Sequence, residues 1–220
     1  MYRRRQSGVT LIEIAVVLAV VGFLAMVAVP AFDGMFADQR VKAAARSVAD
    51  AFFLARAEAI RTGRSHFVVF QQALGATEPI VIVDDGVPTT ENCTIDANEV
   101  VHSFGAVDGV SWGTTSTLAN GTSAPNDSGA APASVATGSS FTDATRIPSN
   151  TALWVLFQPD GIPRLFTPGA GSTCAAISPP GRGGGAIYLT NTRRDYAVVL
   201  SNLGTSRTHP WSASAGGWKN

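Results

Sequence analysis

The sequence predicts an α+β fold in which one long N-terminal helix packs on an antiparallel β-sheet domain. Two observations support this prediction. Residues 1–64 contain an apolar run followed by an amphipathic segment with helical periodicity, and residues after 65 change to short β-branched and aromatic runs separated by turn residues. With 220 residues, 45% of them hydrophobic, the chain can bury one sizeable core beside that helix.

The apolar run at residues 9–32 has the composition of a membrane-spanning helix. Glu13 is its one carboxylate, and the 19 residues from 14 to 32 carry no charge. At about 1.5 Å per residue they span roughly 28 Å, the thickness of a bilayer core. Three arginines at positions 3–5 predict a cytoplasmic N-terminus and an extracytoplasmic C-terminal domain. The alternative is a cleaved secretory signal, but the run is longer than an ordinary signal core and no A-x-A site closes it.

The segment 33–64 is predicted to continue the helix as an amphipathic spine for the globular domain. Pro30 should kink the helix rather than stop it, because the apolar periodicity resumes beyond it. Gly63 supplies the stop, so the helix should end near Thr62. Six apolar residues recur at three- and four-residue spacing and mark one face: Val41, Ala45, Val48, Phe52, Ala55 and Ala59.

Residues 65–220 are predicted to form the β-domain. Strands are expected at 66–71, 80–84, 100–104, 151–158, 162–167, 185–191 and 196–202. Pro159-Asp160-Gly161 is expected to form a turn, and the last two strands should pair as a hairpin around Thr192–Asp195. Residues 113–146 contain mostly Ser, Thr, Ala, Gly, Asn and Pro. This composition predicts a long, flexible, exposed loop, either a variable insertion or a binding loop.

Charge is balanced in total but divided along the chain. Between Arg64 and Arg146 there are nine acidic residues and no Lys or Arg, whereas from Arg146 onward there are seven basic residues and two acidic ones. Loss of the three arginines at positions 3–5 would leave 13 basic against 16 acidic residues, a side-chain net charge of −3. A mildly acidic protein is a poor general nucleic-acid binder.

The two cysteines, Cys93 and Cys174, would lie on the outer side of the membrane. An even count in an oxidising compartment favours one disulfide, the alternative being two buried thiols. No further cysteine or histidine stands at metal-binding spacing from either, so neither zinc nor any cofactor is expected. The acidic residues at 84–99 offer oxygen ligands for calcium, but their spacing differs from an EF-hand loop and favours a solvated turn.

No motif in the sequence supports an enzyme. Residues 109–113 match the G-x-S-x-G nucleophile elbow, but the residues that follow cannot form the helix that this elbow requires. The glycine-rich stretch at 180–185 lacks the lysine and the Ser/Thr of a P-loop. Single histidines stand within or beside strands, where packed or surface roles are expected: His66, His102 and His209.

The N-terminal residues resemble a known processing signal. A short basic leader ends at Gly8, V-T-L-I-E follows at 9–13, and the apolar run reaches Pro30. This pattern resembles the class III signal of type IV pilins and type II secretion pseudopilins. The resemblance implies that prepilin peptidase removes residues 1–8 by cutting between Gly8 and Val9, and methylates the new amine of Val9. Here Val9 stands where the family prefers Phe or Met.

Glu13 fits this resemblance. A charge inside an apolar helix costs roughly 2.5–3.5 kcal/mol, and no residue within one turn of Glu13 can neutralise it. A new amine at Val9 could do so. The resemblance implies that Glu13 pairs with the amine of a neighbouring subunit, so that Glu13 and Pro30 belong to a filament-assembly helix.

Two further segments extend the resemblance beyond the N-terminal signal and narrow it to one family. LARAEAIRTGR at 54–64 and the F-x-P-x-G pattern at 157–161 resemble the GspH/FimT family of minor pseudopilins. This implies a structural subunit of a type II secretion pseudopilus in the inner membrane. Its partners would be prepilin peptidase, other pseudopilins or pilins, and the inner-membrane assembly platform. The alternative is a minor type IV pilin, FimT- or FimU-like, in pilus priming or DNA uptake.

Some FimT-type members carry a C-terminal Gly-Arg-x-Arg motif that contacts DNA. The nearest match here, residues 204–209, has the single arginine Arg207. Arg193 and Arg194 in the adjacent predicted turn could add charge. Affinity scales with the number of phosphates neutralised, so these arginines predict weak DNA contact at most, and nucleic acid is not an expected partner.

Overall fold

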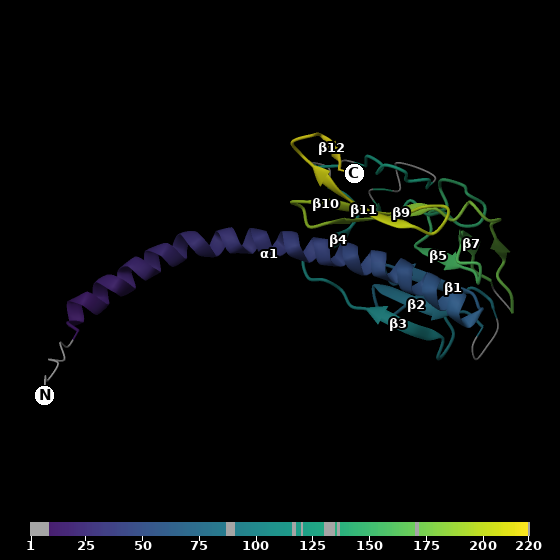
Figure 1. The fold of residues 1–220 in the computed structure, drawn as a ribbon, viewed down its shortest axis with the longest axis horizontal. Helices are drawn as coiled ribbons and strands as arrows, with labels where there is room; N and C mark the ends of the chain where they lie inside the picture. Colours follow the sequence, from purple (N-terminus) through teal and green to yellow (C-terminus); the bar gives the residue numbers. More distant parts are fainter. Residues whose placement is uncertain are drawn as a thin grey trace, which may run out of the picture. The chain divides into compact units, whose positions relative to one another are not determined.

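The computed structural model describes residues 9–86, 91–115, 118–119, 121–129, 135, 137–169 and 172–219, without the side chains of 27 and 29–31 (Figure 1). The chain divides into two compact units, Met1–Ala37 and Asp38–Asn220. The elements are α1 (Leu11–Thr62), β1 (His66–Phe70), the 3-10 turn η1 (Ala73–Gly75), β2 (Ile80–Asp84), β3 (Val100–Phe104), β4 (Ser111–Trp112), β5 (Trp154–Phe157), β6 (Pro163–Arg164), β7 (Phe166–Thr167), β8 (Ala176–Ile177), β9 (Gly185–Thr190), β10 (Asp195–Leu200), β11 (Ser206–Ser212) and β12 (Gly217–Trp218).

The helix α1 runs without a break through position 30, so Pro30 does not end it. It ends at Thr62, as predicted. Gly63 follows with a φ of 70°, and its N–H donates to the carbonyl of Ala59 at 3.0 Å. Glycine is common at this position, because it readily adopts the left-handed conformation that caps the last turn of a helix.

The strands form two five-stranded antiparallel sheets. The first has the order β3-β2-β1-β5-β6 and the second the order β12-β11-β10-β9-β4, while β7 and β8 pair separately. The predicted hairpin is confirmed, because β9 and β10 pair with Asp195 opposite Thr190. The predicted turn at Pro159-Asp160-Gly161 is also confirmed, since the Gly161 N–H donates to the Gln158 carbonyl at 2.8 Å. The α+β fold is therefore as the sequence predicts.

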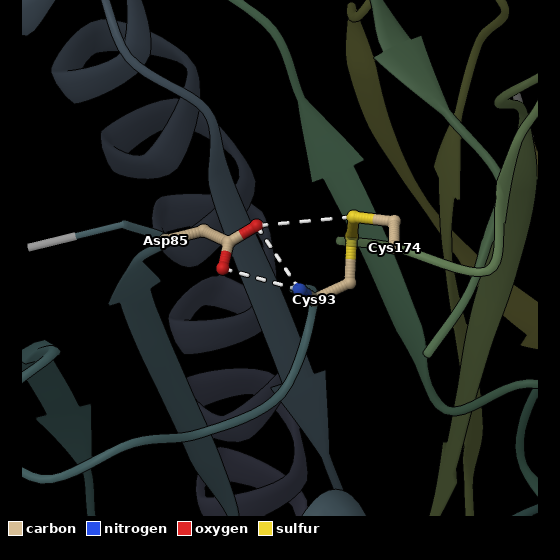
Figure 2. A group of neighbouring side chains, drawn as sticks. All are labelled: Asp85, Cys93 and Cys174. Carbon is tan, nitrogen blue, oxygen red and sulfur yellow. Dashed lines mark hydrogen bonds between the residues drawn. A yellow bond between two sulfur atoms is a disulfide. The ribbon is translucent and has the colours of Figure 1, made fainter. Parts of the chain in front are cut away.

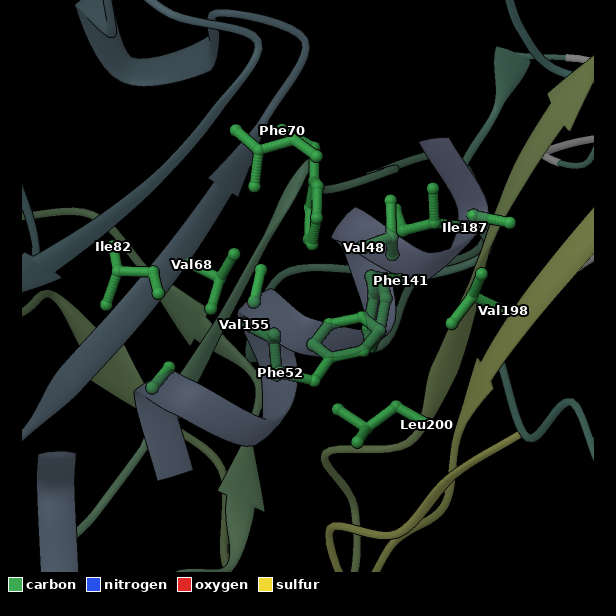
Figure 3. Close-up of a cluster of buried hydrophobic side chains, with 14 of the residues drawn as sticks. Val48, Phe52, Val68, Phe70, Ile82, Phe141, Val155, Ile187, Val198 and Leu200 are labelled. Atoms are coloured by element: carbon green, nitrogen blue, oxygen red, sulfur yellow. The ribbon is translucent and has the colours of Figure 1, made fainter. Parts of the chain in front are cut away.

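The core lies where the second half of α1 packs against both sheets (Figure 3). All six residues of the predicted apolar face are at most 1% exposed. Phe52 is central, because its ring contacts those of Phe70 from β1 and Phe141, with centroids 5.5 and 6.1 Å apart. Val198 and Leu200 of β10 close the same cluster from the second sheet.

Each sheet is buried on its other face as well. Phe67 and Val83 turn away from α1 and pack with Cys93 and Phe166, while Tyr188 and other outward residues of the second sheet pack with Ala124 and Val135. Every residue of β1, β2 and β9 is therefore buried. This explains why these strands read as nearly continuous apolar runs.

Four strands were not predicted: β4, β8, β11 and β12. Of these, β11 is the longest, with seven residues of sequence SRTHPWS. Most of its residues are polar and its burial is mixed, so the period-two apolar pattern is absent. Pairing with β10 along five residue pairs makes it a strand.

The prediction of an exposed loop at 113–146 is wrong for much of the described part of that segment, although Thr122, Asn126, Thr137 and Thr145 are exposed. Ala119, Val135 and Phe141 are at most 1% exposed. The carboxylate of Asp195 accepts the backbone N–H groups of Thr115 and Ala119, at 3.1 and 3.0 Å. Small side chains let this backbone lie against the second sheet. Buried hydrogen bonds hold it there, in place of the large apolar side chains that the segment lacks.

Phe52 and its neighbour Phe53 form a matched pair, because Phe52 is 1% and Phe53 73% exposed. We expect Phe52→Ala to lower the free energy of unfolding by about 3–5 kcal/mol through lost burial and a residual cavity. Phe53→Ala should change it by less than about 1 kcal/mol. Denaturant titration of the detergent-solubilised chain measures both, and equal losses would contradict this account of the core.

Candidate assembly site

The start of α1 is closed by a capping box. Thr10 precedes the first helical residue, and Glu13 is the third residue of the helix. The Thr10 N–H and hydroxyl both donate to Oε2 of Glu13, at 2.8 and 2.9 Å, and the Glu13 N–H donates to the Thr10 hydroxyl at 3.3 Å. This reciprocal pattern satisfies donors that a helix N-terminus otherwise leaves free.

The capping box revises one step of the sequence argument. No charged group lies within one turn of Glu13, but Thr10 gives its carboxylate two hydrogen bonds, so the carboxylate already has a local partner. The signal was present in the sequence, because T-L-I-E at 10–13 fits the [ST]-x-x-[DE] pattern that precedes an apolar run.

The first unit presents an extended apolar surface. Among the described side chains between positions 9 and 36, fifteen large apolar ones are each at least 52% exposed: Val9, Leu11, Ile12, Ile14, Val16, Val17, Leu18, Val20, Val21, Phe23, Leu24, Met26, Phe32, Met35 and Phe36. Exposed apolar area on this scale marks a protein or membrane interaction site. Among the described residues, no helix combines the length and apolarity needed to cross a membrane.

The predicted processing residues fall at the edge of this region. Gly8 lies outside the described residues, and Val9, the first described residue, is 70% exposed. Position 30 is helical, but the side chain of Pro30 lies outside the described part.

A disulfide joins Cys93 to Cys174 across a Cα–Cα distance of 5.1 Å (Figure 2). Asp85, at the end of β2, lies against it. Its carboxylate accepts the backbone N–H groups of Asn92 and Cys93 at 3.1 Å each, and an oxygen lies 4.0 Å from Sγ of Cys174. Asp85 and the two sulfurs are close enough to share an ion. The thiolate is the metal-binding form of cysteine, however, and here both sulfurs are bonded to each other.

The expectation of a solvated acidic turn is wrong for three of its carboxylates, those of Asp84, Asp85 and Glu99. Asp84 is 9% exposed, and Asp85 and Glu99 are each 1% exposed. The Arg64 guanidinium donates to Asp84, and Glu99 accepts the N–H groups of Gly86 and Asp96. These carboxylates therefore act as buried acceptors that organise the chain between β2 and β3, a role that their spacing in the sequence does not reveal.

Burial raises the pKa of Asp85 from 3.8 to about 6, and repulsion from Glu99 and Glu91 adds to the rise. The N–H groups of Cys93 and Asn92 act in the opposite direction, because they stabilise the ionised form.

The three arginines considered for DNA contact are not gathered in one place. Arg193 and Arg194 are exposed in the turn between β9 and β10, where Arg194 donates to Asp38 at 2.6 Å. Arg207 lies on β11 opposite Val199. Five positions separate Val199 from Arg194, on the order of 17 Å along a strand. Arg207 therefore adds little to a patch formed by the other two.

The comparisons with known proteins address the N-terminal end. A family model described as the prokaryotic N-terminal methylation motif matches residues 3–29. Neither the curated proteins nor the solved structures yield a match. The chain thus carries the N-terminal motif of a type IV pilin-like or pseudopilin precursor, ahead of a helix packed on antiparallel sheets. The motif implies processing by prepilin peptidase and assembly with other pilins.

The raised pKa of Asp85 predicts a pH dependence of stability. The folded-state pKa of about 6 exceeds the ordinary 3.8. The contribution of Asp85 to the free energy of unfolding is therefore fully present below pH 3.8, and it is lost as pH rises through 6. Between about pH 4 and pH 7 the native chain should therefore lose about 1–3 kcal/mol relative to Asp85→Asn. Denaturant unfolding of both chains at the two pH values tests this, and parallel pH profiles would contradict it.

Proposed function

We propose that this protein is a minor pseudopilin, a structural subunit of a type II secretion pseudopilus of the GspH/FimT type. The observation that carries the proposal is the uncovered apolar surface of residues 9–36, which begins within the matched methylation motif. A surface of this kind needs a lipid or protein environment, and a filament subunit uses both in turn.

Charge and hydropathy support an anchor in the membrane. We place the N-terminus in the cytoplasm, because Arg3, Arg4 and Arg5 precede the apolar run. The helix at 9–32 would cross the inner membrane once and leave residues 38–220 in the periplasm. The disulfide between Cys93 and Cys174 supports this placement, because disulfides persist in oxidising compartments.

Cleavage between Gly8 and Val9 would create an amine one residue before Thr10. Both hydrogen bonds from Thr10 end on Oε2 of Glu13, and in the described part of the chain Oε1 has no hydrogen-bond partner. Oε1 is therefore the oxygen we assign to the methylated amine of a neighbouring subunit. The capping box would hold the carboxylate in one orientation and reduce the entropy lost on pairing.

The role we propose for the β-domain is structural rather than catalytic. Ser111, the serine of the G-x-S-x-G match, lies in the two-residue strand β4, and Trp112 after it packs on the core. His66 is buried beside Asp84, with Nε2 3.7 Å from a carboxylate oxygen, and His102 is exposed on β3. These placements fit packing and surface roles.

The first test concerns processing. We expect the native host to yield a mature chain that begins at Val9, and Gly8→Phe to leave the full-length chain in the membrane. Gly22→Leu is the matched control, because a side chain added at Gly22 meets nothing within 4 Å. Mass spectrometry of the N-terminus distinguishes the forms, and an intact Met1 in the native host would rule out the processing step. Glu13→Ala should still be cleaved but should enter filaments poorly.

The second test distinguishes a subunit of a type II secretion pseudopilus from a subunit of a type IV pilus. Deletion of the chain in its native host should abolish or strongly reduce export of secreted enzymes while surface pili remain assembled. Secretion assays and electron microscopy of the same strain measure both outcomes. Normal secretion with loss of pili would replace the pseudopilin proposal by a minor type IV pilin.

A further inference from the structure

We propose that a hollow on the outer face of the second sheet, the face turned away from α1, binds a small phosphate-bearing ligand. The hollow has a volume of about 410 Å³. Its lining residues come from the segment 113–146, from strands β10 and β11, and from the turn between these strands: Asn126, Val199, Ser201, Thr205, Arg207 and His209.

The fold builds this hollow from several fixed parts. Arg207 and His209 stand two positions apart on β11 and so share one face of the sheet. The Ser128 hydroxyl donates to Oδ1 of Asn202 at 3.3 Å, and this bond holds the segment that carries Asn126 beside the β10–β11 turn. The walls are thus tied to each other by contacts that do not use the lining groups.

Three lining side chains have polar groups with no described partner. Arg207 and Asn126 are exposed, and no hydrogen bond or ion pair among the described residues engages either side chain. His209 is only 3% exposed, and its Nδ1 lies 2.8 Å from the carbonyl oxygen of Lys219. Its Nε2 is buried with no partner in the described chain. A buried polar atom without a partner is rare and calls for an explanation.

The chemistry of these groups selects the ligand. A carbonyl only accepts, so Nδ1 of His209 carries a proton, and Nε2 accepts a hydrogen bond whenever it carries no proton itself. The Arg207 guanidinium and the Asn126 amide need acceptors. A phosphate near its second pKa of about 6 supplies both, because it carries negative oxygens and a P–OH. Sulfate and carboxylates lack that hydroxyl at neutral pH.

The local charges permit binding of moderate strength. Arg207 and Lys219 are positive, whereas Asp127, next to Asn126, is negative. The Asp127 carboxylate accepts hydroxyl bonds from Tyr188 and Ser140, at 2.5 and 2.6 Å, so it is turned to groups outside the hollow lining. With one opposing carboxylate nearby, a dissociation constant on the order of 1 mM is expected for inorganic phosphate.

The test follows the ring resonances of His209 by NMR while inorganic phosphate is added at constant ionic strength to the full-length chain in detergent micelles. His209→Gln assigns the signals. We expect a saturable shift, at least about tenfold weaker binding in Arg207→Gln, and unchanged binding in Arg193→Gln. Arg193 is the matched control, because it is exposed and lines a different hollow.

Three outcomes would overturn the proposal: no saturable shift of the His209 ring, equal weakening by the Arg207 and Arg193 variants, or sulfate binding as tightly as phosphate. Arg207 is exposed, so its variant remains informative even where changes at the buried His209 unfold the chain.

Discussion

The packing of one helical stripe between two sheets is the contact on which the rest of the second unit depends. The stripe from Val41 to Ala59 contributes mostly small side chains, which let both sheets approach α1 closely, and Phe52 fills the space between them. A helix with only one apolar stripe would normally pack against only one sheet. Here the same stripe serves both, so neither sheet can be placed without it.

Because α1 occupies the inner faces, each sheet needs a second cover, and the two covers differ in chemistry. The first sheet is covered by a layer that the Cys93–Cys174 disulfide and the buried carboxylate of Asp85 tie together. The second is covered by the described part of the segment 113–146, which relies on small residues and on hydrogen bonds that involve Asp195 and Asp127. Covalent and polar links replace the large apolar side chains that these irregular segments lack.

The two units use apolar residues in opposite ways. Residues 38–220 bury theirs in an internal core, whereas residues 9–36 leave theirs exposed on the part of α1 whose N-terminal end is capped by Thr10 and Glu13. A helix stabilised by its own cap can remain helical while its side chains exchange one apolar environment for another. That property suits the passage from a membrane into a filament that we propose for this segment.

The sequence by itself determined what depends on local pattern. The extent of α1, its stop at Gly63, its buried face and the strands β1, β2, β9 and β10 follow from periodicity and turn residues, and the motif at 3–29 follows from residue order. Tertiary structure alone decided what depends on partners distant in the chain. It made a strand of the polar segment β11 by pairing it with β10, buried Ala119, Val135 and Phe141 of the segment 113–146, turned the carboxylate of Asp85 toward Cys174, and set Arg207 apart from Arg194. Such contacts depend on backbone pairing and buried hydrogen bonds, which composition does not encode.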